Sequence, residues 1–306
     1  MFSADQIRYI KREDIDVSSW NNCINKASNG LIYAQSSFLD AMCTHWDALV
    51  LNDYENVMPI SWRKKRGFYY IYPPYFIPSL GVFGNNITSS LVQSFLNYIP
   101  QKFKYWEIDL NEKNEMGIFP KLKAEKRRNI FLSLQSPYEV LLDNYKRLAK
   151  RKLALAVEND LTIHRDAAPA KIIQSYEKHY EEKNRIIPDE VYSQLQQLFT
   201  VLPKENYRTY LVENQNEIAA FYIVLVDQKN VYSLIGGSTE EGKKYGAFYM
   251  ATDAAIKDFS NTGKTFRFEG SDKEGIAFFN FQFGSYAVDY WRIKMNNLPW
   301  PLNYFK

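Results

Sequence analysis

Two stretches of the chain share one rhythm of apolar and polar positions. Residues 48–74 and 209–237 each read as strand, polar turn, strand, polar turn, strand, because apolar and aromatic runs alternate with short polar segments. The first polar turns align as NDYEN (52–56) and ENQNE (213–217), and each stretch follows a helical region. A duplicated α/β domain is the simplest account of this pattern.

The join between the two domains is predicted near residues 121–137, between the two repeats. Residues 121–129 read KLKAEKRRN, which is polar and basic, and FLSLQ after them fits a short strand. We therefore predict a polar linker here and two domains, 1–130 and 131–306, each with a mixed, mostly antiparallel sheet flanked by helices.

A helix is predicted directly after the join. Ser136 reads as its N-cap, Pro137 as its first residue, and Glu139 completes a capping box. The helical pattern continues to Asn159. Its predicted buried stripe has helical spacing and consists of Leu141, Tyr145, Leu148 and Leu155.

The region after the second meander is predicted to add a helix and two strands. The helix starts near Tyr245 and stops at 261–263, where Gly263 is well placed as a C-terminal cap. KTFRFEGS (264–271) then reads as a strand that ends in a turn, and the segment from Tyr286 reads as a last strand.

The composition is that of a globular protein. Of 306 residues, 46% are hydrophobic, 24% charged and 16% aromatic, which suffices for a core in each domain. The longest apolar runs, such as IAAFYIVLV (218–226), are shorter than the ~18 residues of a membrane span. The N-terminal MFSADQIRYIKRED lacks a signal peptide's apolar core, and two cysteines make no disulfide framework. We therefore expect a cytoplasmic protein without a membrane span.

Positive charge is concentrated in one segment. Between Lys121 and Lys152, ten basic residues stand against three acidic ones, a local charge of +7, whereas the whole chain carries +3. Such a field favours an anionic partner. Residues 121–152, and in particular Lys150 and Arg151, are therefore candidates for binding tRNA or another anionic substrate. A solvated linker and helix face is the alternative, which a steep salt dependence of binding would exclude.

Several kinds of catalysis are poorly supported by the residues present. His45, His164 and His179 are the only histidines, and no pairs of His or Cys have the spacing of a zinc site. The chain has no G-x-S-x-G elbow, no P-loop and no G-x-G-x-x-G fingerprint. We therefore predict neither a metal site nor a Ser-His-Asp hydrolase.

The segment after the second meander has features of a phosphate-binding loop. Its strand ends in glycines, its loop contains Lys243 and Lys244, and Gly246 and Ala247 open a helix. Small residues at a helix start let backbone N–H groups approach a phosphate, which the helix dipole favours. N-acetyltransferases hold the pyrophosphate of coenzyme A at such a loop, so these four residues are predicted to bind the donor. Phe248 stands where that loop has a small residue.

The C-terminal block is the most specific part of the sequence. It reads FRFEGSDKEGIAFFNFQFGSYAVDYWRIKMNN (266–297). This block resembles the closing motif of the Fem-type peptidyltransferases and their acetyltransferase-like relatives. The positions that match this motif are Gly275, Ile276, Phe279, Phe283 and Gly284. NYKRLAKRKLALA and GGSTEEGKKYGAFYMATDAAI also look like the family's segments, so that the clear resemblance covers about residues 136–297.

The resemblance implies an α/β fold of two tandem GNAT-like domains and a transferase. It implies transfer of an acyl or aminoacyl group to an amine, without a metal or a tightly bound cofactor. The donor would be an acyl-CoA or an aminoacyl-tRNA, and the acceptor a cell-wall peptide precursor. The family's Lys in F-K-x-x-F-G is Asn280 here, which can donate a hydrogen bond but lacks the charge. Asn280 is therefore a candidate donor contact that makes aminoacyl-tRNA less favoured.

Attack of an amine on a carbonyl needs a proton acceptor and an oxyanion partner. Glu269, at the end of a strand facing a glycine turn, is the candidate general base, and a carboxylate bonded to the turn is the alternative. Tyr245 is the candidate proton donor to the leaving group. Tyr72, in YPPYFIPSLGVFG (72–84), and Phe281 are candidate substrate contacts. The alternative function is a non-catalytic module of this fold that binds a nucleotide-linked or peptide precursor.

Overall fold

The computed structural model describes residues 7–117, 122–181 and 187–301. Its chain forms two compact units: unit 1 comprises Met1–Arg127 and Asp289–Lys306, and unit 2 comprises Arg128–Val288. Lys121, the first residue of the basic segment, lies outside the described residues. The boundary after Arg127 falls within the predicted join at 121–137. The segment from Asp289 groups with unit 1, however, whereas the predicted division placed it in the second domain.

Unit 1 is built around one sheet whose strands follow the order β1-β2-β3-β4-β6-β13. All neighbours are antiparallel except β4 and β6, which are parallel. The strands are β1 (Ile7–Ile10), β2 (Trp46–Leu51), β3 (Asn56–Lys65), β4 (Phe68–Ile71), β6 (Phe103–Asp109) and β13 (Tyr286–Asn296), and the short β5 (Phe83–Gly84) pairs with β3. The α-helices are α1 (Val17–Lys26), α2 (Ser36–Met42) and α3 (Ser89–Asn97), with 3-10 turns at Arg12–Asp14 and Ile32–Ala34.

Unit 2 repeats this arrangement with the order β8-β9-β10-β11-β12-β7. Here only β11 and β12 are parallel. The strands are β7 (Lys123–Ser133), β8 (Thr162–Arg165), β9 (Tyr207–Asn214), β10 (Glu217–Val226), β11 (Asn230–Ser238) and β12 (Thr265–Arg267). The helices are α4 (Tyr138–Asp143), α5 (Arg147–Glu158), α6 (Pro169–Glu181), α7 (Asp189–Val201), α8 (Glu240–Tyr245), α9 (Ala247–Asp258) and α10 (Glu274–Asn280), with 3-10 turns at Lys204–Asn206 and Phe281–Phe283.

The matching strand orders confirm the predicted duplication. The two meanders, β2-β3-β4 and β9-β10-β11, turn at the predicted polar segments. Asn52 and Tyr54 (φ 50° and 59°) turn the first, and Gln215 and Asn216 (φ 49° and 66°) turn the second. Short polar residues tolerate this left-handed backbone better than branched ones, which is why the turns were visible as NDYEN and ENQNE.

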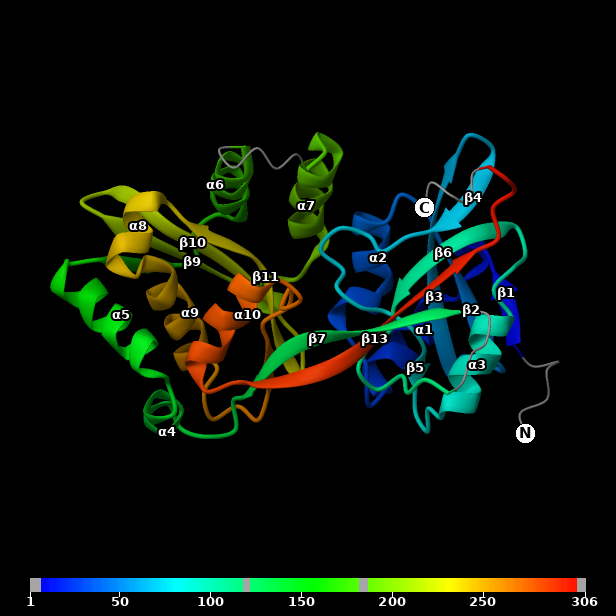
Figure 1. Ribbon diagram of the computed structural model, residues 1–306, viewed down its shortest axis with the longest axis horizontal. Helices are drawn as coiled ribbons and strands as arrows, with labels where there is room; N and C mark the ends of the chain where they lie inside the picture. Colours follow the sequence, from blue (N-terminus) through cyan, green and yellow to red (C-terminus); the bar gives the residue numbers. More distant parts are fainter. Residues whose placement is uncertain (1–6, 118–121, 182–186, 302–306) are drawn as a thin grey trace. The chain divides into compact units, whose positions relative to one another are not determined.

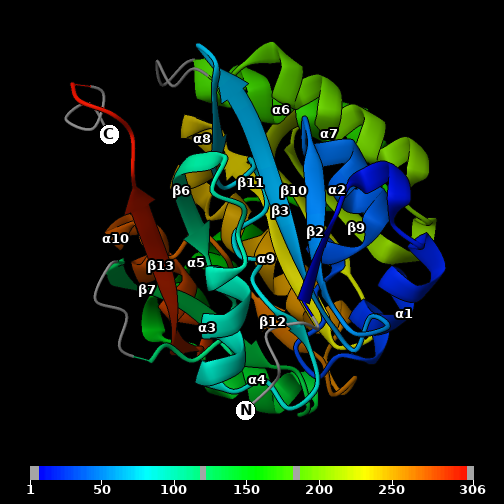
Figure 2. The same ribbon diagram turned by 90° about the vertical axis from the view of Figure 1, so that its right-hand side faces the viewer.

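Each sheet carries helices on both faces. In unit 2, α9 packs beneath the sheet and α6 and α7 lie on its opposite face (Figure 1). In unit 1, α3 lies on one face and α1 and α2 on the other (Figures 1 and 2). Because strand side chains alternate between faces, each buried strand supplies both layers of the core.

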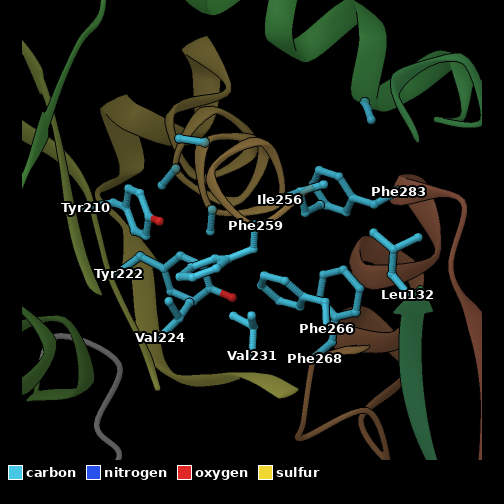
Figure 3. Packing of buried hydrophobic residues seen from close by; sticks show 14 of the residues in the cluster. Leu132, Tyr210, Tyr222, Val224, Val231, Ile256, Phe259, Phe266, Phe268 and Phe283 are labelled. Carbon is cyan, nitrogen blue, oxygen red and sulfur yellow. The ribbon is translucent and has the colours of Figure 1, made fainter. Parts of the chain in front are cut away.

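The larger described core lies between the unit 2 sheet and α9. Tyr210, Tyr222 and Val224 on the strands meet Ile256 and Phe259 from α9 and its end (Figure 3). Each of the five is at least nine-tenths buried, and full burial of such side chains contributes about 1.5–3 kcal/mol apiece. The strands of unit 2 are therefore fixed in position by aromatic packing.

The helix predicted after the join is wrong in two respects. It is broken into α4 and α5, because the chain turns at residues 144–146 and Lys146 N donates to the carbonyl of Gln282 (2.8 Å). Ser136 does not cap it: Pro137 precedes the first helical residue, and no side chain caps α4. The fully buried α5 residues are Ala149 and Ala156, while Leu148 and Leu155 are half-buried.

Two further local predictions are corrected. The polar stretch expected as a linker is most of β7, whose residues before Asn129 are exposed or half-buried, so their polarity fits a solvated strand. The helix expected from near Tyr245 is α9, which begins at Ala247, and the short α8 before it was not predicted. Helix α9 ends at Asp258, with Phe259 as its C-cap, so that Gly263 (φ 72°) belongs to the following loop.

Candidate functional site

The strands β11 and β12 of unit 2 run together for only three residues. Their parallel pairing ends with Tyr232 opposite Arg267. Beyond this point β12 stops, whereas β11 continues to Ser238. Among the described strands, none pairs with the β12 side of residues 233–238. Such an edge presents backbone N–H and C=O groups to which an extended ligand can add as a further strand.

A β-bulge lies at the start of this open edge. Ile223 of β10 pairs with Ile235, and Val224 pairs with Ser233, so that Leu234 has no residue opposite it. A bulge increases the local twist and re-aims backbone groups, and bulges are frequent beside active sites. The bulge therefore lies where the pairing of β11 with β12 ends.

A buried polar cluster follows the end of β12. Arg267 Nε donates to Glu269 Oε1 (3.2 Å), and Asn129 of β7 donates to the other carboxylate oxygen. Arg267, Glu269 and Asn129 are 2%, 8% and 6% exposed. The Arg267 guanidinium also lies 4.3 Å from the ring centroid of Phe131. The predicted strand end and turn are confirmed, since Glu269 and Gly270 both have positive φ (51° and 64°).

The polar cluster and the α9 helix lie on opposite faces of the unit 2 sheet. Phe266 belongs to the core against α9, so its neighbour Arg267 points to the α6 face by strand alternation. In β11, Gly236 contacts Phe248 of α9, whereas Gly237 faces α6. The α6 face therefore combines an open strand edge with buried charge.

His179 is a further candidate site residue that its sequence pattern did not single out. It lies in α6, and a Cβ built on Gly237 would stand 3.3 Å from its Nε2 atom. Its ring makes an edge contact with Phe221, with centroids 5.8 Å apart. The imidazole thus lies over β11 beside the open edge. The pair of glycines that ends β11 was the signal for a close approach here.

Asn280 is buried beneath the turn that follows Glu269. Its side chain is 3% exposed, and Nδ2 donates to Ser271 Oγ (3.1 Å). Its carbonyl accepts a hydrogen bond from Ser285 Oγ (2.8 Å). Asn280 thus packs against the same loop as Glu269, and its predicted contact with a donor stays a prediction.

The predicted phosphate loop is folded against α5. Lys243 and Lys244 pair with Glu240 and Glu241 on the surface of α8. Gly246 has φ 78°, and a Cβ there would lie 2.4 Å from the carbonyl oxygen of Lys152. Lys152 Nζ donates to the carbonyls of Lys243 and Lys244 (3.1 and 3.0 Å).

These contacts explain Gly246 and Ala247 by packing alone. Gly246 allows the close approach of α5, and Ala247 is fully buried in the core at the start of α9. Phe248, which replaces the small residue of the acetyltransferase loop, packs on Gly236 and stacks with Phe279 at 5.2 Å. Donor binding by Lys243, Lys244, Gly246 and Ala247 stays a prediction.

The other predicted residues lie in several places. Tyr245 lies at the end of α8, where its hydrogen bond to Glu241, followed by that residue's charge, raises its pKa. The structure does not bring it beside Glu269, because α8 packs with α5 and α9. Phe281 is half-buried against the α9 core. Tyr72 belongs to unit 1, is 45% exposed, and accepts a hydrogen bond from Ser61 through its carbonyl (3.3 Å).

One of the two predicted basic residues, Lys150, lies beside a cavity. Lys150 lines a cavity of about 500 Å³ between α4, α5 and α9, and its Nζ donates to the carbonyl of Asp143 (2.9 Å). Asp253, on the same cavity, accepts hydrogen bonds from the hydroxyls of Tyr138 and Tyr145, and burial raises its pKa. Arg151 is exposed.

Within residues 7–117, 122–181 and 187–301, no three His, Cys, Asp or Glu side chains gather in a way that would hold a metal ion. The same residues contain no helix both long and apolar enough to cross a membrane.

Residues 143–274 match the family described as acetyltransferase (GNAT) domain. This match lies within unit 2, which contains the parted parallel strands β11 and β12. No curated protein matches the sequence.

Solved structures extend the likeness to the whole chain. It is similar to FemX (TM-score 0.62, 12% identity, covering 93% of this chain and 96% of FemX). It is also similar to a tandem GNAT protein from the clavulanic acid biosynthesis pathway (TM-score 0.56, 9% identity, 96% and 99% covered). A third is L-PGS from Bacillus licheniformis (TM-score 0.51, 10% identity, 85% and 87% covered). The predicted fold of two tandem GNAT-like domains is thus confirmed.

Proposed function

We propose that this protein transfers an acyl or aminoacyl group to an amine acceptor and that unit 2 carries the reaction. The observation that supports this most is the open edge of β11, with its bulge at Leu234, in a GNAT-type domain. A donor chain can pair with residues 233–238 as an added strand. Backbone N–H groups at the bulge then face the carbonyl that is attacked and stabilise its oxyanion.

The α6 face supplies the groups for the amine in this proposal. His179 Nε2, over Gly237, accepts the proton that the acceptor's ammonium group loses to become a nucleophilic amine, and the imidazolium then gives a proton to the hydroxyl that leaves the donor ester, roles suited to imidazole near neutral pH. Glu269 has both oxygens engaged by Arg267 and Asn129. We propose that Glu269 fixes the loop after β12 and keeps a negative charge near the site. It does not remove the proton itself.

The donor is proposed to be an aminoacyl-tRNA-type ester rather than coenzyme A, even though Asn280 lacks the charge of the family's Lys. Asn280 is 3% exposed and bonded to Ser271, so in this proposal the donor's phosphates are bound elsewhere. The side chains of Lys243 and Lys244 are already paired, and Gly246 is covered by α5. Both observations disfavour a pyrophosphate at the start of α9. The exposed basic residues of α5, with Arg151 among them, are the proposed contacts to the donor's phosphates.

A thermal-shift screen followed by a transfer assay tests this function. The ligands are acetyl-CoA, longer acyl-CoAs, charged tRNA and UDP-linked muropeptides. A ligand at about 100 times its Kd stabilises the fold by roughly 2.7 kcal/mol. We expect charged tRNA and one peptide precursor to raise Tm and mass spectrometry to detect the aminoacylated product. A shift with acyl-CoA alone would overturn the donor assignment.

A non-catalytic binding module is the second candidate. Phe248 stands where an acetyltransferase loop has a small residue, and its ring packs on Gly236 and stacks with Phe279. This favours a protein that kept the fold for binding. It predicts a Tm rise with one precursor and no product with any donor in the same screen, at any enzyme concentration.

A further inference from the structure

Four aromatic rings of unit 1 surround one ammonium group. Lys102 Nζ lies 4.7 Å from the ring centroid of Tyr9 and 4.9 Å from that of Phe103. It lies 5.6 Å from Tyr69 and 5.8 Å from Trp62. A cation within about 6 Å of an aromatic ring is attracted by the ring's quadrupole. We call these four rings the aromatic cage.

The cage is assembled from four strands of one sheet. Tyr9 comes from β1, Trp62 from β3, Tyr69 from β4, and Phe103 begins β6. Tyr69 meets Trp62 and Phe103 edge to face, with centroids 5.5 and 6.4 Å apart. Because these neighbours are tilted rather than stacked in parallel, several rings offer a surface to the same ammonium group.

A buried carboxylate fixes two of the rings. Asp47 is 6% exposed and accepts hydrogen bonds from the Tyr9 hydroxyl and from Trp62 Nε1 (2.7 Å). Burial, followed by the bond to Asp47 and its charge, raises the pKa of Tyr9, so its hydroxyl remains a donor. The rings are therefore held before any ligand arrives, and the negative charge behind them favours a cation.

Lys102 holds its place in the cage by ring contacts. Its side chain is exposed, and within the described part of the chain it makes no ion pair or hydrogen bond. A flexible lysine held in this way can move aside for another cation. A cavity of about 610 Å³, lined by Gln101, Phe103 and Lys104 among others, shares Phe103 with the cage.

We propose that the aromatic cage binds the ammonium group of a small cationic ligand, such as a trimethylammonium compound, in place of Lys102. The structure then shows the protein's own ammonium standing in for that of the ligand. This site lies wholly in unit 1 and does not depend on acyl transfer by unit 2.

Choline and its neutral isostere 3,3-dimethylbutan-1-ol test the proposal in the full-length protein. The Trp62 indole N–H resonance, assigned by Trp62→Phe, is followed by NMR during titration. We expect choline to move it saturably and the neutral alcohol to bind at least about tenfold more weakly. The Trp20 indole, which is fully buried and donates to the carbonyl of Ala34 (2.8 Å), serves as the internal control and stays unmoved.

Three variants sharpen the test. Lys102→Met keeps the apolar stem but removes the competing cation, so choline is expected to bind about threefold to tenfold more tightly. Tyr69→Leu removes a ring and should weaken binding by a similar factor, while Tyr69→Phe keeps the ring and should not. Equal shifts with choline and the alcohol would overturn the proposal. So would binding by Lys102→Met alone, because Lys102 would then be a permanent occupant.

Discussion

In each unit one strand of the parallel pair extends beyond the other, but the two units differ in which strand is the longer one. In unit 1, β4 stops at Ile71, and its partner β6 continues to Asp109. In unit 2, β12 stops at Arg267, and its partner β11 continues to Ser238. By strand order, β6 corresponds to β12 and β4 to β11, so the longer strand occupies a different position in each unit.

In unit 1, the end of the longer strand, β6, forms salt bridges with the neighbouring strand β13. Glu107 and Asp109, 6% and 5% exposed, both meet Arg292 of β13. Arg292 Nε and Nη2 bind the two oxygens of Asp109 (2.6 and 2.7 Å), and Lys294 Nζ lies 3.0 Å from Glu107. The cavity lined by Glu107 and Asp109 has only about 20 Å³. In unit 1 the carboxylates at this strand end are therefore paired with basic side chains of the same unit, whereas in unit 2 the β11 edge has no described partner strand.

The largest expected effect comes from breaking the unit 1 network. Arg292→Met leaves two buried carboxylates without their guanidinium, which costs about 3–5 kcal/mol in the free energy of unfolding. Urea unfolding followed by circular dichroism measures it. Arg165→Met is the control: Arg165 pairs with Asp258 at the surface (2.8 Å) and should cost less than about 1 kcal/mol. Equal losses would mean that the unit 1 network is no more than a surface ion pair.

The corresponding change in unit 2 should be reversible by a second substitution. Arg267→Met removes the guanidinium from the buried Glu269 and is expected to cost about 3 kcal/mol. Arg267→Met with Glu269→Met removes both charges and should recover more than half of the loss. In unit 1, Arg292→Met with Asp109→Met still leaves Glu107 buried and should recover less. Urea midpoints of the four variants decide whether the two networks differ in this way.

Each unit has a glycine with a left-handed backbone, and the two differ in how closely other atoms approach them. Gly246 (φ 78°) faces the Lys152 carbonyl, whereas Gly67 of unit 1 (φ 84°) has nothing within 4 Å of a built Cβ. Alanine costs about 1–2 kcal/mol at either site because of the left-handed backbone. Gly246→Ala should cost at least about 1 kcal/mol more, since α5 must shift. Equal urea midpoints would show that α5 does not press on Gly246.

The sequence predicted the duplicated sheets better than the site. Alternating apolar runs and polar turns are local signals, so both meanders were found. Glu269 was found because it precedes a glycine turn. The pairing of Glu269 with Arg267 and Asn129 was not predicted, because Asn129 is 140 residues away in the chain. The cover over Gly246 was missed for the same reason: it comes from Lys152.

Strand β7 shows how composition can mislead. Its first residues are basic, and their composition predicts a linker. In the structure they form a solvated strand, in which Lys126 pairs with Asp289 (3.2 Å). Polar alternation on an exposed strand has no apolar signature, so only the partner strand reveals it. His179 was dismissed for want of metal partners, and its place over Gly237 depends on how α6 packs on the sheet.

The smallest expected effect on stability concerns the exposed charges of α5. Lys150→Glu with Arg151→Glu should change the free energy of unfolding by less than about 0.5 kcal/mol. If the basic face of unit 2 binds a tRNA-type donor, the same variant should weaken binding of total tRNA and lower the log–log salt slope by about 1–2. Fluorescence anisotropy over a salt series at pH 7 measures both quantities.

The matched control reverses two exposed basic residues of unit 1, Lys65→Glu with Arg66→Glu, which changes the net charge by the same amount. Only the unit 2 variant should lose affinity beyond what net charge explains, because local contacts, not total charge, set the number of released counterions. If both variants lose the same affinity and slope, tRNA responds to overall charge alone. The basic face of α5 would then be a solvated helix face, and the donor proposed for unit 2 would lose its contact surface.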